Sequence, residues 1–65
     1  MNLYRGNERY PVLQSSEYSV KVTNPAAISP GDAIMEIIVD GRVHRRDVRV
    51  IGPSQKKNWL DIADR

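Results

Sequence analysis

The chain has 65 residues, a formal net charge of +2 and no cysteine. This length allows one domain with a small core, and the absence of cysteine excludes disulfides and thiolate metal sites while fitting a reducing cytoplasm. The longest apolar runs, such as Ile37-Ile38-Val39, are far shorter than the ~20 residues of a membrane-spanning helix, so we expect no membrane segment.

The N-terminal third predicts short strands. Residues 1–9 are polar, and we expect them to be loosely ordered. The segment Tyr10–Leu13 predicts a strand that Pro11 confines to a sheet edge, since proline cannot donate to a ladder. It would pair antiparallel with Tyr18–Val22, which alternates in hydropathy. The residues of that second strand expected to face the core are Tyr18, Val20 and Val22.

The centre of the chain predicts a β-hairpin. The segment Thr23–Asp32 contains two prolines and reads as a connection. Two β-branched runs follow, predicted as strands over Ala33–Val39 and Val43–Ile51. The Asp40-Gly41 pair between them favours a two-residue turn, because both residues tolerate positive φ.

The C-terminal segment fits two interpretations. Trp59, Leu60, Ile62 and Ala63 could form one face of a short helix capped by Ser54. Alternatively, residues 58–63 form a strand with Leu60 and Ile62 inward. We favour the strand, because the lysines at 56 and 57 would crowd the positive end of a helix dipole.

Together these elements predict a mainly β fold. We expect a single domain over residues 1–65, built as a small five-stranded SH3-like barrel or half-barrel around the central hairpin Ala33–Ile51. A barrel also protects strand edges, which a valine-rich sheet would otherwise expose.

Positive charge is concentrated in one quarter of the chain. Residues 42–57 have a net charge of +5, whereas residues 1–41 have −2 and residues 58–65 have −1. Arginine suits phosphate geometry, so the segment is a candidate site for DNA or RNA, or for an acidic protein surface. The alternative is a solvated face with no partner. The candidate binding residues are Arg42, Arg45, Arg46, Arg49, Lys56 and Lys57.

Alternation divides the basic strand between two faces. Arg45, Asp47 and Arg49 are expected on one face, with the two arginines about 13 Å apart at 3.3 Å per residue. His44 and Arg46 are expected on the other face, which we predict to be partly buried because it also carries valines at 48 and 50. The Arg45 and Arg49 face is therefore the better candidate surface.

No catalytic constellation stands out. His44 is the only histidine, and Asp47, the nearest carboxylate in sequence, belongs to the opposite strand face. No serine lies in a nucleophile-elbow pattern, and no carboxylate spacing matches a metal site. We therefore expect no enzyme activity, no metal and no cofactor.

Two short stretches resemble known families. Pro30-Gly31-Asp32, followed by a strand and the Asp-Gly turn, resembles the C-terminal half of swapped-hairpin transcription regulators and antitoxins, which are dimers that bind DNA through basic residues. Arg5-Gly6-Asn7-Glu8-Arg9 is similar to the arginine motif of PilZ domains, which would make Arg5 and Arg9 ligands of cyclic di-GMP. The second PilZ motif, Asp/Asn-x-Ser-x-x-Gly, is absent.

The sequence therefore favours a small, non-enzymatic, regulatory binding module. Our first hypothesis is that the module binds nucleic acid through the basic strand. The alternative is a protein-interaction or assembly module, in which the apolar segment Ile34–Val39 or Trp59 docks on a partner or on a second copy of the chain.

Overall fold

The computed structural model describes all 65 residues and contains seven β-strands and one short 3-10 helix. In chain order the elements are β1 (Asn2–Arg5), β2 (Glu8–Pro11), β3 (Gln14–Ser15), β4 (Ser19–Lys21), η1 (Pro25–Ala27), β5 (Gly31–Val39), β6 (Arg42–Pro53) and β7 (Trp59–Asp64). The three-residue η1 is the only helical element, so no helix is long enough to cross a membrane.

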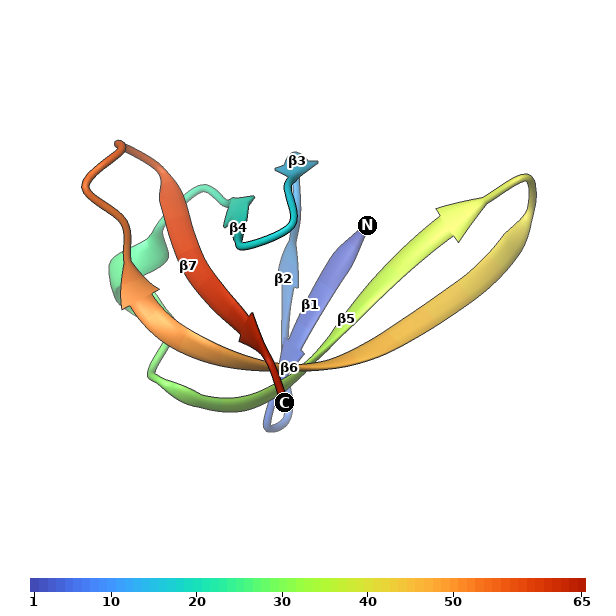
Figure 1. Ribbon diagram of the computed structural model, residues 1–65, viewed down its shortest axis with the longest axis horizontal. Helices are drawn as coiled ribbons and strands as arrows, with labels where there is room; N and C mark the ends of the chain where they lie inside the picture. Colours follow the sequence, from blue (N-terminus) through green and yellow to red (C-terminus); the bar gives the residue numbers. More distant parts are fainter.

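The strands form one antiparallel sheet in the order β2-β1-β5-β6-β7-β4-β3. The sheet curls strongly but is not closed (Figure 1). Its two edge strands, β2 and β3, follow each other in the chain and are joined only by Val12 and Leu13. The N–H of Val12 donates to the carbonyl of Met1 at 3.0 Å, and that of Leu13 donates to the carbonyl of Lys21 at 2.9 Å. The link therefore hydrogen-bonds to two segments near opposite ends of the sheet, Met1 before β1 and Lys21 in β4.

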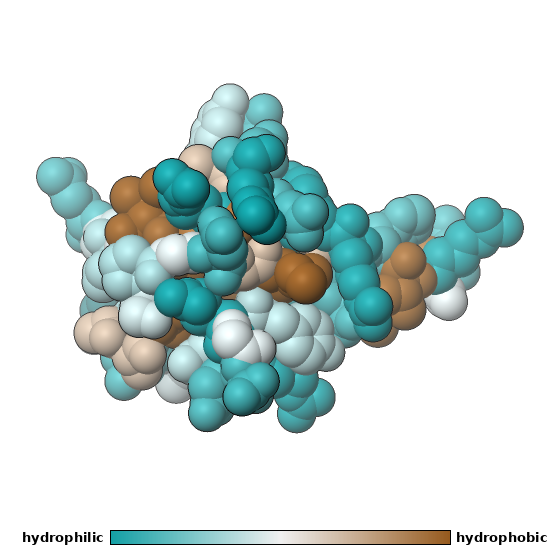
Figure 2. Space-filling view, turned by 90° about the horizontal axis from the view of Figure 1, so that it is seen from below, coloured by the Kyte–Doolittle hydropathy of each residue, from teal (hydrophilic) through white to brown (hydrophobic).

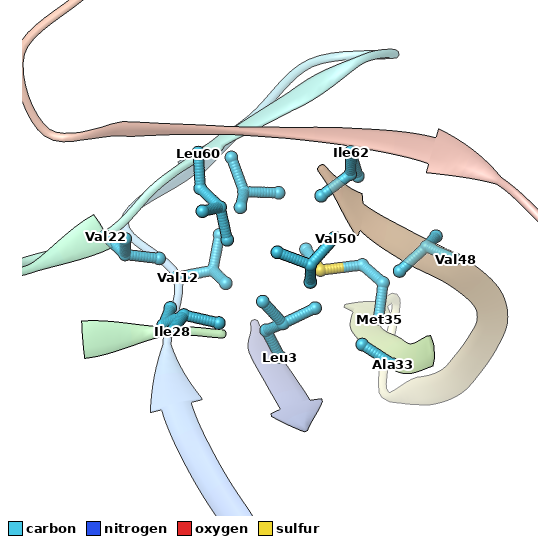
Figure 3. Close-up of a cluster of buried hydrophobic side chains, with 11 residues drawn as sticks. Leu3, Val12, Val22, Ile28, Ala33, Met35, Val48, Val50, Leu60 and Ile62 are labelled. Carbon is cyan, nitrogen blue, oxygen red and sulfur yellow. The ribbon is translucent and has the colours of Figure 1, made fainter. Parts of the chain in front are cut away.

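The core lies on the inner side of the curled sheet. Eleven buried side chains from most of the strands and from the segments beside β2, β4 and η1 point toward one another there (Figure 3). They are Leu3, Val12, Val20, Val22, Ile28, Ala33, Met35, Val48, Val50, Leu60 and Ile62. Each large aliphatic side chain buried in this way stabilises the fold by about 1.5–3 kcal/mol.

The predicted central hairpin is confirmed. β5 pairs with β6 from Gly31 opposite Val50 to Val39 opposite Arg42. The turn residues Asp40 and Gly41 have φ values of 51° and 76°. Positive φ at both positions matches the right-handed twist of the flanking strands, which explains why this dipeptide terminates the hairpin.

The C-terminal strand is also confirmed, as β7. Leu60 is fully buried and Ile62 nearly so, both on the inner side as predicted. β7 pairs with β6 on one side and with β4 on the other, so its apolar residues complete the core. A helix here would have left the backbone of β4 without this partner.

The predicted arrangement of five strands needs correction. The domain is mainly β, but the sheet has seven strands, it is open, and an SH3-like barrel is not confirmed. Contrary to the expected loose order, residues 2–11 form a β1–β2 hairpin that buries Leu3 completely. β2 is an edge strand, as Pro11 requires, but its partner is β1; the short β3 pairs with β4 instead.

Tyr18 does not face the core. Its exposed fraction is 66%, whereas Val20 and Val22 are buried as predicted. The reason is that β4 begins only at Ser19, so Tyr18 belongs to the preceding turn. Its carbonyl nevertheless accepts a hydrogen bond from the N–H of Ile62 at 2.9 Å, which extends the pairing between β4 and β7.

Candidate interaction surface on the projecting hairpin

The end of the β5–β6 hairpin projects beyond the rest of the sheet. β1 reaches β5 only as far as Glu36, opposite Asn2, and β7 reaches β6 only as far as Val48, opposite Asp64. Residues 37–47 therefore pair only across the hairpin, and their outer strand edges face solvent. We call residues 37–47 the hairpin tip; it is the two-stranded arm at the right of Figure 1.

Apolar side chains are exposed on this tip. Ile38 and Val43 lie directly opposite each other, with exposed fractions of 56% and 55%, and Val39 beside the turn is 49% exposed. Figure 2 shows hydrophobic atoms at this projecting end, set among hydrophilic ones. Ile38 and Val43 share the outer face, whereas Val39 points to the inner face. Exposed apolar side chains paired in this way are compatible with an interaction site.

The structure divides the six predicted binding residues among three places. Residues 42–53 form one strand, and burial of Val48 and Val50 confirms that its Arg46 face turns toward the core. Arg45 and Arg49 lie on the opposite, exposed face, as predicted. Lys56 and Lys57 lie in the loop between β6 and β7, at the opposite end of the molecule from the hairpin tip (Figure 1).

Most of the arginines have acidic neighbours. The arginines of β6 form three ion pairs: Arg45 with Glu36 at 3.5 Å, Arg46 with Asp64 at 3.4 Å, and Arg49 with Asp32 at 3.9 Å. Arg42 has no carboxylate within 4.0 Å. Arg65 adds a second contact to Asp32 at 3.5 Å. The positive charge of the strand is therefore compensated at three of its four arginines, and Arg42, beside the turn, is the exception.

Trp59 is not available for docking on a partner. Its exposed fraction is 8%, and the ammonium of Lys56 lies 4.8 Å from the centroid of its ring. This cation–π contact gives Lys56 a local structural role as well. The apolar surface that the sequence predicted for protein contacts is therefore confined to the hairpin.

Glu36 is a functional candidate that the sequence reading missed. It lies on the outer side of the sheet but is only 9% exposed. Its carboxylate accepts hydrogen bonds from Asn2 Nδ2 at 3.2 Å and from the Tyr4 hydroxyl at 3.3 Å, and it pairs with Arg45. A carboxylate in the middle of the run Ile34–Ile38 was the available signal, since buried polar groups require partners.

A cleft of about 410 Å³ lies on the inner side of the sheet, between the hairpin and the β3–β4 turn. Its polar lining comes from Ser15, Ser16, Glu17 and Arg46, and its apolar lining from Val20, Met35, Ile37 and Ile62. Neither a histidine nor a lysine lines this cleft beside the serines. No three histidine or carboxylate side chains are grouped so that they could hold a metal ion.

Arg5 is held by the chain itself. Its guanidinium donates to the carbonyls of Ser29 at 3.2 Å and Pro30 at 2.9 Å. It also lies 2.6 Å from the position that a Cβ would take on Gly31, whose φ is 136°. The arginine of the PilZ-like stretch thus fixes the entry into β5.

No family model, no curated protein and no solved structure matches this chain. The interpretation of the hairpin tip therefore depends on its own geometry and chemistry.

Proposed function

We propose that the chain is a non-enzymatic protein-interaction module that contacts its partner through the hairpin tip. The observation that carries this proposal is the combination, on residues 37–47, of exposed apolar side chains with two unpaired strand edges. A two-stranded hairpin alone is only marginally stable in water. A partner that covers the outer face of this one would bury Ile38 and Val43, and pairing with an edge would extend its ladder at the same time.

Site-specific photo-crosslinking in cells tests this proposal. The photoreactive residue p-benzoylphenylalanine replaces Val43 at the hairpin tip or, as a control, Gln55 in the exposed loop at the far end. We expect a discrete crosslinked product from position 43 and none from position 55. The Ile38→Ser change in the Val43-labelled protein should reduce the yield, because Ile38 lies beside the photoreactive group.

Two results would contradict the proposal. Equal labelling from positions 43 and 55 would indicate random encounters and not a specific surface. A product from position 43 that is indifferent to Ile38→Ser would show that Ile38 does not contribute to recognition.

A second candidate function is the binding of DNA or RNA. It is favoured by Arg42, which forms no ion pair and shares one strand face with His44 and Arg46. Binding of this kind weakens steeply as salt rises, because counterions are released from the phosphates. Absence of binding to any nucleic acid at about 50 mM salt would exclude it. Arg42→Ala should weaken binding more than Arg49→Ala, since Arg49 already has Asp32 as a partner.

A further inference from the structure

The edge of β6 that faces away from β5 is unpaired along the hairpin tip. β7 ends at Asp64, opposite Val48, and no other strand lies beside residues 42–47 on that side. An edge of this kind offers free N–H and C=O groups in register, so it can accept one additional strand.

The turn determines which residues offer these groups. In a two-residue hairpin the residues beside the turn, Val39 and Arg42, form a hydrogen-bonded pair, and such pairs recur at every second position. The intervening residues of β6 direct their N–H and C=O groups away from β5. Within the hairpin tip these residues are Val43, Arg45 and Asp47.

The opposite end of β6 gives the same assignment. Ile62 donates its N–H to the carbonyl of Tyr18, so the backbone N–H and C=O groups of Ile62 point toward β4. Because these groups alternate along a strand, those of the next residue, Ala63, point toward β6. Ala63 lies opposite Arg49. Arg49 therefore directs its groups toward β7, and the alternation continues without a bulge to Asp47 and the tip.

The side chains along this edge determine what kind of strand fits. Arg42 and Arg46 lie on the inner face and Arg45 on the outer face, with 69% of the Arg45 side chain and 43% of the Arg46 side chain exposed. A second copy pairing through the same edge with Arg45 at the two-fold axis would place the two Arg45 side chains opposite each other, which is unfavourable. An acidic strand avoids this repulsion: Arg45 keeps Glu36 as its partner, and carboxylates of the added strand lie opposite Arg42 and Arg46 on the inner face.

We propose that the free edge of β6 over residues 43–47 binds an extended acidic segment of a partner protein as an eighth strand. This inference rests on the proposed function and specifies the chemistry of the partner. The added strand would run antiparallel to β6 and thus in the direction of β7, and at Asp47 it would displace Arg65, which follows Asp64 in the same register. The existing contact of Arg46 with Asp64 is a weak obstacle, because Asp64 is 74% exposed and exposed pairs stabilise little.

The register predicts a pattern for the segment. Residues opposite Arg42, His44 and Arg46 share the inner face and should be acidic, so carboxylates recur at every second position. The residue opposite Val43 lies on the outer face and should be apolar. The partner segment is therefore expected to alternate, with glutamate or aspartate on one face.

The experiment titrates the full chain with a synthetic peptide of about nine residues that alternates glutamate with valine and threonine. A matched peptide carries glutamine in place of every glutamate. We expect the glutamate peptide to bind about tenfold or more tightly than the glutamine peptide at low salt. Backbone amide signals of Val43, Arg45 and Asp47 should shift in NMR spectra, while that of Ile38, which faces the outer edge of β5, should not.

N-methylation of the peptide backbone tests the strand pairing itself. Methyl groups on the peptide amides that face β6, opposite Val43 and Arg45, should abolish binding. Methyl groups on the intervening amides, which face solvent, should leave it nearly unchanged. On the protein, Val43→Pro removes one outward N–H without touching the β5 ladder and should weaken binding.

Several outcomes would overturn the inference: no binding of the glutamate peptide, equal binding of the glutamine peptide, or indifference to the position of the methyl groups. Equal competition by a single-stranded oligonucleotide, with no effect of N-methylation, would identify a general polyanion site instead. If position 43 still gives its specific crosslink while the acidic peptide fails to bind, the protein-interaction proposal stands and only this inference is lost.

Discussion

Glu36 and Arg45 face each other across the central hairpin, with 3.5 Å between the carboxylate Oε2 and a guanidinium nitrogen. The glutamate is nearly buried while the arginine is largely exposed. The pair therefore connects the part of the sheet that lies beside β1 to the hairpin tip. Asn2 and Tyr4 on β1 hold the same carboxylate from the other side.

Removal of the Glu36 carboxylate should destabilise the fold. Glu36→Ala leaves the side chains of Asn2 and Tyr4 without their acceptor, and we expect it to lower the free energy of unfolding by about 1–3 kcal/mol. Glu36→Gln keeps an acceptor oxygen and should cost less. Urea unfolding of both variants and of Tyr4→Phe measures the effect; an Ala variant as stable as the parent would show that the cluster contributes nothing.

Truncation in the core should have the largest effect. Leu60 is fully buried among the aliphatic side chains of Figure 3, so Leu60→Ala should cost about 2–5 kcal/mol. That is a large share of the stability of so small a domain. The control is Ile51→Ala, since Ile51 is 53% exposed and should change stability by about 0.5 kcal/mol or less. Thermal unfolding should separate the two variants clearly.

The hairpin turn should depend on Gly41. At a φ of 76° a Cβ is unfavourable, so Gly41→Val should cost roughly 1–2 kcal/mol even though no neighbouring atom would clash. Gly41→Asn should be tolerated better, because asparagine accepts positive φ more readily than other residues do. Chemical denaturation of the two variants is the measurement, and equal stability would contradict this assignment of the turn.

A change at the hairpin tip should weaken partner binding without lowering the stability of the fold. Ile38→Ser removes exposed apolar surface, so its free energy of unfolding should remain within about 0.5 kcal/mol of the parent. Crosslinking from position 43 should nevertheless fall. A variant that unfolds would mean that the tip supports the fold and is not reserved for a partner, and circular dichroism at increasing temperature distinguishes the two cases.

The central hairpin was predictable because its signals are local. The Asp40-Gly41 turn and the β-branched runs around it require no knowledge of the remaining chain, and the alternation of β6 follows from them. The inward positions of Leu60 and Ile62 were predictable for the same reason.

The remaining arrangement was not predictable in this way. β1, β2, β3 and β4 have between two and four residues each, too few for a hydropathy period, and their pairing is decided by tertiary contacts. The burial of Glu36 depends on β1 lying beside it, and the contact of Lys56 with the Trp59 ring depends on the loop before β7. The ion pairs of Arg46 and Arg49 likewise join residues from separate strands.

The two-residue link through Val12 and Leu13 has a consequence for folding. The link hydrogen-bonds to Met1 and to Lys21. It therefore connects the β1–β2 hairpin to the antiparallel pair of strands β4 and β7. Local hairpins can form early, whereas this coupling requires distant parts of the chain to meet. A flexible insertion between Val12 and Leu13 would loosen the connection. Native-state hydrogen exchange would then reveal two units that open independently where the parent opens as one.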